Sequence, residues 1–524
     1  MDIAKRRTVV DSTLITVVNF EQGQMSEKTN IAVGSKVITQ KLNAEESNLI
    51  MKTFKQKALI SALAGASALA MAGAANAVYV NQDGLGQALV YPYYTVRGGT
   101  VTLISVVNTT TQAKAVKVRF LEGKNSQEVL DFNLFLSAKD VWTGAVVPNA
   151  AGASLVTGDR SCTNPKIPSG GVDFRNFAYS TDSGALTSLD RTREGYVEML
   201  EMATIPNATA LGVAVTHVAG TAPCTTARIN DAGIATATGL AAPSGGLFGN
   251  GTLLNANGGM STGYDATAFD GWTSNINLTS SGSIRPNLAS GTSKVSVVTT
   301  GGNLYVAGWA NSIDAVSATI MHSNVYGEYA YTKDAVVGTD FVITMPTKNQ
   351  YVNSTSVTAP FQNIWDSSAG ISCDDVSLVG YDREEVTSST PDDFSPKPAS
   401  GKNQLCYEAN VISFGGASVL GSTNVANINP IQNGGADVAT AGKEGGWLEL
   451  AFSATTAKLT STSGSVTTTG SGTAVAGGSG AQTYFGLPTI GFALSSASYK
   501  TGNPQQNYSS SYGLRFARSI SSAQ

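Results

Sequence analysis

The sequence predicts a mainly β protein, built of antiparallel β-sandwich-like domains with long loops rich in Gly, Ser and Thr and with at most one or two short helices. Three observations support this fold class. Short runs of alternating apolar and polar residues recur along the chain, which is the pattern of strands with one buried face. Only 13% of the residues are charged, about half the usual share. Glycine is abundant, with 56 residues, as expected for a protein with many turns.

A secretory signal precedes the predicted fold. Residues 51–77 contain three lysines, then an apolar run, and then small residues that end in Ala75-Asn76-Ala77. These are the three parts of a signal peptide, and we expect cleavage between Ala77 and Val78. The apolar run is short and consists mostly of alanine, so we expect no transmembrane span once the signal is removed. Residues 1–50 form an upstream extension that we do not expect in the mature protein.

Removal of residues 1–77 leaves 447 residues, which is enough for two or three domains. The leader carries nine Lys/Arg and six Asp/Glu, so its removal changes the net charge from −4 to −7. We expect the mature chain to be divided into an N-terminal β-sandwich domain at 78–225, a Gly/Ala-rich loop region at 226–290, and a C-terminal β-rich domain at 291–524 with a low-complexity loop at 454–482.

Period-two runs predict the strands of the N-terminal domain. In Ala115–Leu121, apolar side chains alternate with Lys117 and Arg119, which we expect to lie on a solvent-facing side of the sheet. The other strands that we expect in this half are Thr100–Asn108, Leu130–Leu136, Val141–Val147, Glu194–Met202 and Leu211–Val218.

The second half repeats the pattern and contains the one clear helix candidate, Ser312–Tyr326, in which Val316, Ile320 and Met321 recur at helical spacing. The strands that we expect there are Lys294–Val298, Leu304–Trp309, Phe341–Met345, Val376–Tyr381, Trp447–Phe452 and Gly486–Ala493.

Four cysteines remain in the mature chain, and none forms a C-x-x-C pair. In an exported protein, an even number of separated cysteines predicts disulfide bonds. Three pairings are possible, and proximity in the sequence favours Cys162 with Cys224 and Cys373 with Cys406. A zinc site is the alternative, but it lacks paired ligand spacing.

The chemistry-bearing residues are few. An acidic, weakly charged body gives no electrostatic footprint for nucleic acid, so we expect no nucleic-acid partner. His217 and His322 are the two histidines, and we expect both to be structural or surface residues. The cluster Tyr91-Pro92-Tyr93-Tyr94 fits either the edge of a core or an exposed surface that stacks on sugars or on a neighbouring subunit.

The densest acidic groups are the candidates for metal binding. Calcium binding needs several oxygens around one ion, and a glycosidase needs two carboxyl groups at a fixed separation. The alternative is a solvated loop in which Arg383 pairs with a carboxylate. The calcium candidates are Asp374, Asp375, Asp382, Glu384 and Glu385. We expect no other cofactor, and we identify no catalytic residues.

Several segments of the mature chain resemble a family of exported, largely uncharacterised proteobacterial cell-surface proteins, some of them labelled surface-layer-like. The resemblance implies export and display at the bacterial outer surface, and it supplies no catalytic residues. The segments that carry it are DGLGQALVYPYYTVRGGTVTLISVVNTT (83–110), VKVRFLEGKNSQEVLDFNLFLSAKDVWTGAVV (116–147), RTREGYVEMLEM (191–202), GTDFVITMPTK (338–348), YDREE (381–385) and LCYEANVI (405–412).

The sequence therefore supports two alternative functions. The first is an exported cell-surface structural or adhesive protein, which is not an enzyme and which associates with itself, as a layer or fibre, or with a surface component. Strands with few charges, such as Leu130–Leu136 and Gly486–Ala493, would favour self-pairing if they formed sheet edges. The second is a secreted carbohydrate-active hydrolase or carbohydrate-binding protein, which would need a cleft with two carboxylates and an aromatic wall.

Overall fold

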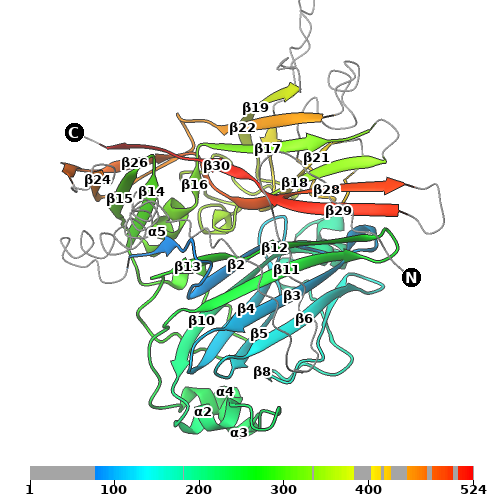
Figure 1. Ribbon diagram of the computed structural model, residues 1–524, viewed down its shortest axis with the longest axis vertical. Coiled ribbons are helices and arrows are strands. Elements are labelled where there is room, and N and C mark those ends of the chain that lie inside the picture. The colour runs from blue at the N-terminus through cyan, green and yellow to red at the C-terminus, as the bar shows by residue number, and fades with distance from the viewer. Residues whose placement is uncertain are drawn as a thin grey trace, which may run out of the picture. The chain divides into compact units, whose positions relative to one another are not determined.

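Two antiparallel sheets, one of seven strands and one of six, form a β-sandwich in the N-terminal half (Figure 1). The structure is a computed structural model that describes residues 77–180, 182–332, 336–382, 403–414, 418–426, 445–468, 475–499 and 506–522. The seven-stranded sheet has the order β1 (Tyr79–Val80), β13 (Thr267–Asp270), β2 (Ala88–Thr95), β10 (Glu194–Ile205), β4 (Ala113–Glu122), β5 (Glu128–Leu136) and β8 (Cys162–Asn164). The six-stranded sheet has the order β12 (Met260–Asp265), β11 (Leu247–Asn255), β3 (Val101–Asn108), β6 (Val141–Pro148), β7 (Ala153–Val156) and β9 (Val172–Asp173).

The described strands of the C-terminal half form five smaller sheets. The largest, the five-stranded sheet, has the order β20 (Gln404–Leu405), β19 (Asp374–Asp382), β22 (Gly445–Phe452), β17 (Asn324–Ala330) and β30 (Arg515–Ala517). A four-stranded sheet contains β21 (Ala409–Phe414), β18 (Val337–Thr344), β28 (Ile490–Tyr499) and β29 (Gln506–Gly513). The other three contain β14 (Val295–Thr300), β15 (Asn303–Gly308), β24 (Ser463–Thr468) and β25 (Val475–Ser479); β23 (Lys458–Thr460), β26 (Gln482–Phe485) and β31 (Ser519–Ser522); and β16 (Met321–His322) with β27 (Leu487–Pro488). The mainly β fold class is confirmed.

The helices of the described chain are short. The α-helices are α2 (Ala210–Val215), α3 (Thr226–Ile229), α4 (Asp231–Ala235) and α5 (Ser312–Thr319). Single 3-10 turns lie at Arg97–Gly99, Phe177–Tyr179, Gly184–Thr187, Leu189–Arg193, Leu288–Ser290 and Lys348–Gln350. Among the described residues, no helix combines the length and the apolar character needed to cross a membrane.

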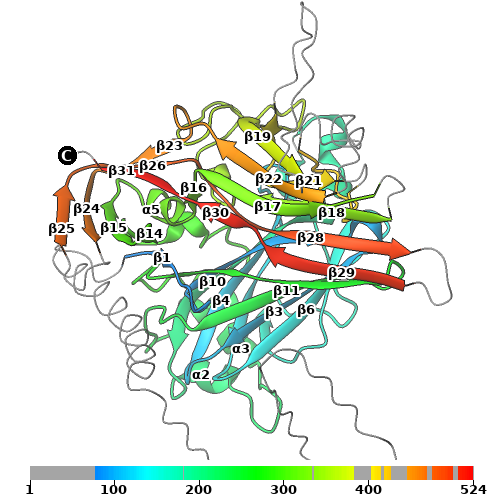
Figure 2. The ribbon, with the colours of Figure 1, turned by 45° about the horizontal axis from the view of Figure 1, so that its top comes forward.

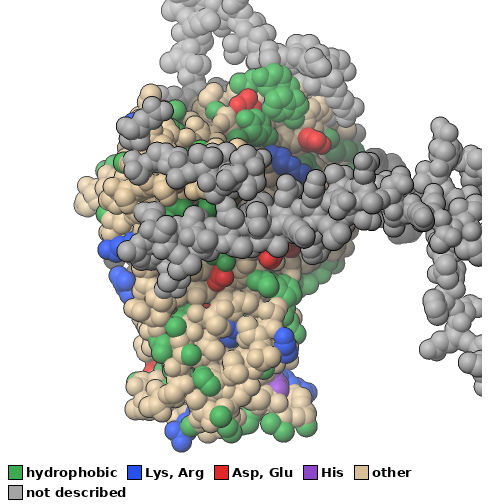
Figure 3. Space-filling model, turned by 60° about the vertical axis from the view of Figure 1, so that its left-hand side comes forward, with side chains coloured by type: hydrophobic (Ala, Val, Ile, Leu, Met, Phe, Trp, Pro, Cys, Tyr) green, Lys and Arg blue, Asp and Glu red, His purple; other side chains and the backbone are tan. Residues whose placement is uncertain are grey.

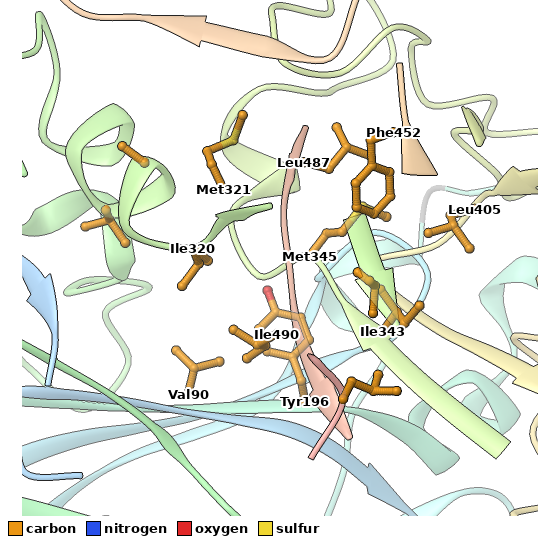
Figure 4. Packing of buried hydrophobic residues seen from close by; sticks show 14 of the residues in the cluster. Val90, Tyr196, Ile320, Met321, Ile343, Met345, Leu405, Phe452, Leu487 and Ile490 are labelled. Atoms are coloured by element: carbon orange, nitrogen blue, oxygen red, sulfur yellow. The ribbon is translucent and has the colours of Figure 1, made fainter. Parts of the chain in front are cut away.

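The seven-stranded sheet is buried on both faces. Toward the six-stranded sheet, Val118 and Phe120 of β4 belong to the same buried cluster as Val106 and Trp142. On the opposite face, Tyr196 of β10 belongs to a second cluster that is built mostly from the C-terminal half. Figure 4 shows Val90 and Tyr196 beneath Ile490, Met345 and Ile343, which come from that half. The two halves therefore share a core, and all described residues fall within one compact unit, 60–524.

The face of β4 that we expected to be solvent-exposed is buried. Lys117 is fully buried and Arg119 is 6% exposed. The Lys117 ammonium pairs with Asp131 and donates to the carbonyl of Ser281 at 2.8 Å, and Asn133 donates to the carbonyl of Thr279. The segment that contains these two carbonyls covers this part of the sheet, so the charges had to be paired inside the protein.

The predicted disulfides Cys162–Cys224 and Cys373–Cys406 are both present, and the described chain has no free cysteine. Their loops differ in length, with sequence separations of 62 and 33 residues. Disulfides of this kind are typical of proteins that fold in oxidising, exported environments. Each bond lies within one half of the chain, so neither ties the two halves together.

Removing either bond by a double Cys→Ser substitution is expected to lower the free energy of unfolding by about 2–4 kcal/mol, because the unfolded chain then regains the entropy of an open loop. The loss should be slightly larger for the bond between Cys162 and Cys224, which closes the longer loop. Urea denaturation of the two variants measures the difference, and peptide mapping without reductant checks the pairing. Free thiols in the purified wild-type protein would contradict it.

Two predictions about helices are wrong. Residues 211–218, expected as a strand, begin with the helix α2, because the Thr209 hydroxyl accepts a hydrogen bond from the Gly212 amide and caps the first turn. The helix expected at Ser312–Tyr326 ends at Thr319. Its last predicted residues instead enter β17, where pairing with β22 and β30 outweighs the local helical pattern.

Two stretches expected as loops contain regular structure. The region 226–290 contains α3, α4 and the strands β11, β12 and β13, which complete the sandwich. The stretch 454–482 contributes β23, β24 and β25, since its threonine and valine residues favour extended backbone. The single strand expected at Gly486–Ala493 is divided into β27 (Leu487–Pro488) and the start of β28. Both β28 and β5 are paired on two sides, so the condition for self-pairing through these strands as sheet edges is not met.

The two halves also meet along a seam between β12 and β29. Figure 2 shows the red strand β29 running beside the green strands of the sandwich. The seam is closed by side chains: the Ser261 amide donates to the Ser509 hydroxyl at 3.0 Å, and the Ser511 hydroxyl donates to the Gly263 carbonyl. Serine side chains of β29 thus provide hydrogen-bond partners for backbone groups of the edge strand β12.

Candidate functional site

Two of the calcium candidates, Asp374 and Asp375, are adjacent residues of β19 and point to opposite faces of the sheet. Asp374 is fully buried, and its carboxylate accepts from the Lys348 ammonium at 2.8 Å and from the backbone N–H of Gln362 at 3.0 Å. On the other face, Asp375 accepts from Gln404. Asp382 ends the same strand.

Glu384 and Glu385 lie outside the described residues. Within the described part of the chain, no group of three or more His, Cys, Asp or Glu side chains is placed to hold a metal ion.

The two histidines have structural contacts. The His217 ring shares a hydrogen bond of 2.8 Å with the Ser137 hydroxyl and lies 3.4 Å from a carboxylate oxygen of Asp140. His322 is buried, and burial lowers its pKa well below the usual value. A neutral imidazole in that position packs against the ring of Phe516.

The tyrosine cluster is part of the core. Tyr91, Tyr93 and Tyr94 are all fully buried, and their hydroxyls donate to the Ser105 carbonyl, the Glu194 carboxylate and the Thr192 carbonyl. Of the two interpretations of this cluster, packing is the one that holds, and these rings offer no surface for a sugar.

A small polar cavity of about 70 Å³ lies between the two halves. It contains two carboxylates, Asp190 and Glu194, and both are bound to the Arg97 guanidinium, at 2.8 and 2.6 Å. The hydrogen bond from Arg97 holds the pKa of Asp190 below its usual range. Glu194 also accepts from the hydroxyls of Ser422 and Thr423 in the C-terminal half.

Both carboxylates of this cavity are therefore paired with cations or hydroxyls, and none of the described residues that line it is aromatic. The arrangement differs from the cleft that a glycoside hydrolase needs, where one carboxyl group must be free to donate a proton. The contacts across the cavity instead connect the two halves.

An open trough of about 580 Å³ crosses the outer face of the six-stranded sheet. It runs over β3, β6, β7 and β11, and all the described residues that line it are uncharged. Its lining is a mixture of hydroxyl, amide and aliphatic side chains. Among them, Leu103 is 38% exposed. The residues that give it this character are Leu103, Ser105, Thr143, Thr157, Asn250 and Thr252.

A second surface feature lies on the five-stranded sheet, on the face turned away from the core. Trp447 of β22 is 38% exposed and stacks on Tyr381 of β19, with ring centroids 4.2 Å apart and planes inclined by 11°. Tyr326 of β17 lies on its other side, 6.3 Å away. We call these three residues the aromatic patch.

Neither the trough nor the aromatic patch was predicted from the sequence. Each depends on strands that are distant along the chain and adjacent in a sheet, such as β17 and β22. A local signal did exist for the patch: Tyr326 with Glu328, and Trp447 with Glu449, occupy alternate positions of their strands on the polar side of the period-two pattern.

In comparisons with known proteins, no family model, no curated protein and no solved structure matches the chain.

Proposed function

We propose that this protein is an exported structural or adhesive protein of the bacterial outer surface, which associates with copies of itself or with a surface component through its sheet faces. The observation that carries the proposal is the trough on the six-stranded sheet, which is broad, open and uncharged. Exposed surface patches that contain aliphatic side chains often mark sites of protein–protein contact. A surface without charges opposes close approach of a second surface only weakly.

Export is supported by the two disulfides and by the signal-like segment 51–77. Low overall charge supports the same function, since only 13% of the residues are charged. Figure 3 shows scattered charged side chains on an otherwise uncharged face. A sparse charge distribution reduces the repulsion between copies at high local concentration.

The variant Leu103→Glu tests the trough. It adds a carboxylate at an exposed position of the surface, so self-association is expected to weaken at least tenfold while the fold is retained. Sedimentation velocity over a concentration series, with and without calcium, measures the association constants. Val213→Glu on α2 is the matched control, because Val213 is 62% exposed and lies away from the trough.

Wild-type protein that stays monomeric at all concentrations, with or without calcium, would contradict self-association. If that protein also degraded a polysaccharide, the second candidate, a secreted carbohydrate-active hydrolase, would replace the structural function. Association that requires calcium would support the predicted calcium site, which includes Asp382.

A further inference from the structure

The aromatic patch lies on a sheet face with a mixed surface chemistry. In the five-stranded sheet, Val325, Leu448 and Leu450 belong to the buried cluster. The alternate residues of β17 and β22 therefore point away from the core. Figure 3 shows hydrophobic side chains gathered beside acidic ones at the upper end of the molecule, at the level where Figure 1 draws β19 and β22.

Strand register fixes the neighbours of each ring. Trp447 lies directly opposite Tyr381 on one side and Glu328 on the other. In the next row of the same face, Glu449 lies opposite Tyr326. Side chains directly opposite each other on one face are about 5 Å apart at their Cβ atoms, so carboxylates and rings alternate within reach of a single ligand.

The polar groups of this face are held in place. The Glu449 carboxylate accepts from the Asn324 amide at 2.7 Å and from the Tyr326 hydroxyl at 3.5 Å, and both contacts go to the same oxygen. Arg515 of β30 lies opposite Tyr326 and is exposed. The face thus offers ring surfaces together with hydrogen-bond acceptors and donors.

We propose that the aromatic patch, with Glu328, Glu449 and Arg515, binds a neutral polysaccharide. One side of a pyranose ring carries C–H groups that stack on an aromatic face, and its rim carries hydroxyls that donate to carboxylates and accept from a guanidinium. The two glutamates disfavour a polyanion, and Arg515 disfavours a polycation. The proposal rests on the adhesive function and names the class of ligand, but it uses a different sheet from the trough.

Depletion onto insoluble polysaccharide tests this proposal with the full mature chain. The probes are microcrystalline cellulose and chitin as neutral polymers, with calcium alginate beads as the anionic one. We expect wild-type protein to bind at least one neutral polymer. Trp447→Ala should weaken that binding at least about fivefold, and Tyr381→Ala should weaken it as well. Trp447→Phe, which keeps a ring, should restore part of it.

The control variant is Phe177→Ala, which removes an aromatic side chain that is 73% exposed and lies outside the patch. It should bind as the wild type does. Circular dichroism and thermal unfolding confirm that each variant is folded, and Tyr381→Ala provides a second probe if Trp447→Ala is unstable. Quenching of tryptophan fluorescence by soluble cello- and chito-oligosaccharides should be lost in Trp447→Phe.

Three results would overturn the proposal: no retention of the wild type on cellulose or chitin, equal retention of Trp447→Ala, or binding to alginate alone. Each is distinguishable from failure of the adhesive function as a whole, because self-association through the trough is measured separately with Leu103→Glu. Loss of polysaccharide binding with intact self-association would assign the two activities to the two sheets.

Discussion

Arg119→Met is expected to lower the free energy of unfolding by about 3–5 kcal/mol, because it leaves two carboxylates without their cation inside the protein. Arg119 binds Glu128 at 2.7 Å and Glu198 at 2.6 Å, and so connects β5, β4 and β10. Glu198 is 2% exposed, and burial already raises its pKa. Urea denaturation measures the loss, and Lys166→Met, at an exposed cation, is the matched control with little expected effect.

Two further measurements identify the cause of this loss. Because a protonated Glu198 needs no cation, the deficit of Arg119→Met should shrink as the pH falls toward 5. The double variant Arg119→Met/Glu198→Gln removes one of the stranded charges and should recover part of the stability. A loss below about 1 kcal/mol at neutral pH, or one that does not change with pH, would show that the ion pairs contribute little.

Wild-type stability is expected to fall as the pH rises from about 5 to 8, and Glu408→Gln should remove most of that fall. Glu408 is 2% exposed, and one of its carboxylate oxygens has no hydrogen-bond partner among the described residues. Burial raises its pKa to about 8, although Lys348 acts in the opposite direction. The folded protein therefore holds a proton that the unfolded chain releases near pH 4.5.

Because the pKa of Glu408 is higher in the folded protein than in the unfolded chain, stability decreases as the pH rises. Below pH 4.5 both states carry the proton and the stabilising effect is complete, and it is lost as the pH rises through 8. Over this window the linkage amounts to several kcal/mol, at about 1.4 kcal/mol for each unit of pKa. Asp131, whose pKa is raised to about 6, acts in the same direction but only in the lower part of the window.

Denaturation of both proteins at intervals between pH 5 and 9 gives the two profiles. Glu328→Gln, at an exposed carboxylate, should keep the wild-type slope. Parallel profiles for the wild type and Glu408→Gln would show that the carboxyl group of Glu408 is already ionised in the folded protein at neutral pH.

Much of the fold could be predicted from the sequence because period-two alternation is a local property of a strand. The run around Val116 and Val118 predicts β4 and the face that packs against the six-stranded sheet. The same pattern says nothing about what covers the other face. Lys117 and Arg119 have the spacing of solvent-facing residues, but both are buried, Lys117 against the distant segment near Ser281.

The candidate site was less predictable for the same reason. The stacking of Tyr381 on Trp447 joins residues from strands that are far apart in the chain, and no local period records that pairing. The disulfides were predictable, since the number of cysteines and their spacing are visible in the sequence. The short helix α2 was missed because an apolar run of six residues fits a strand or a helix equally well.

The sheet that is covered on both sides has a consequence for biogenesis. A chain that emerges from a ribosome or a translocon with its N-terminus first completes the sandwich strands by Asp270, while Ile490 and the rest of β28 are still to come. Until Ile343, Met345 and finally Ile490 have emerged, Val90 and Tyr196 lack some of their partners from the C-terminal half, and the nascent protein presents an apolar surface. Such an intermediate is prone to aggregation until the C-terminal half is complete, and a chain truncated before β28 would keep part of this apolar surface exposed.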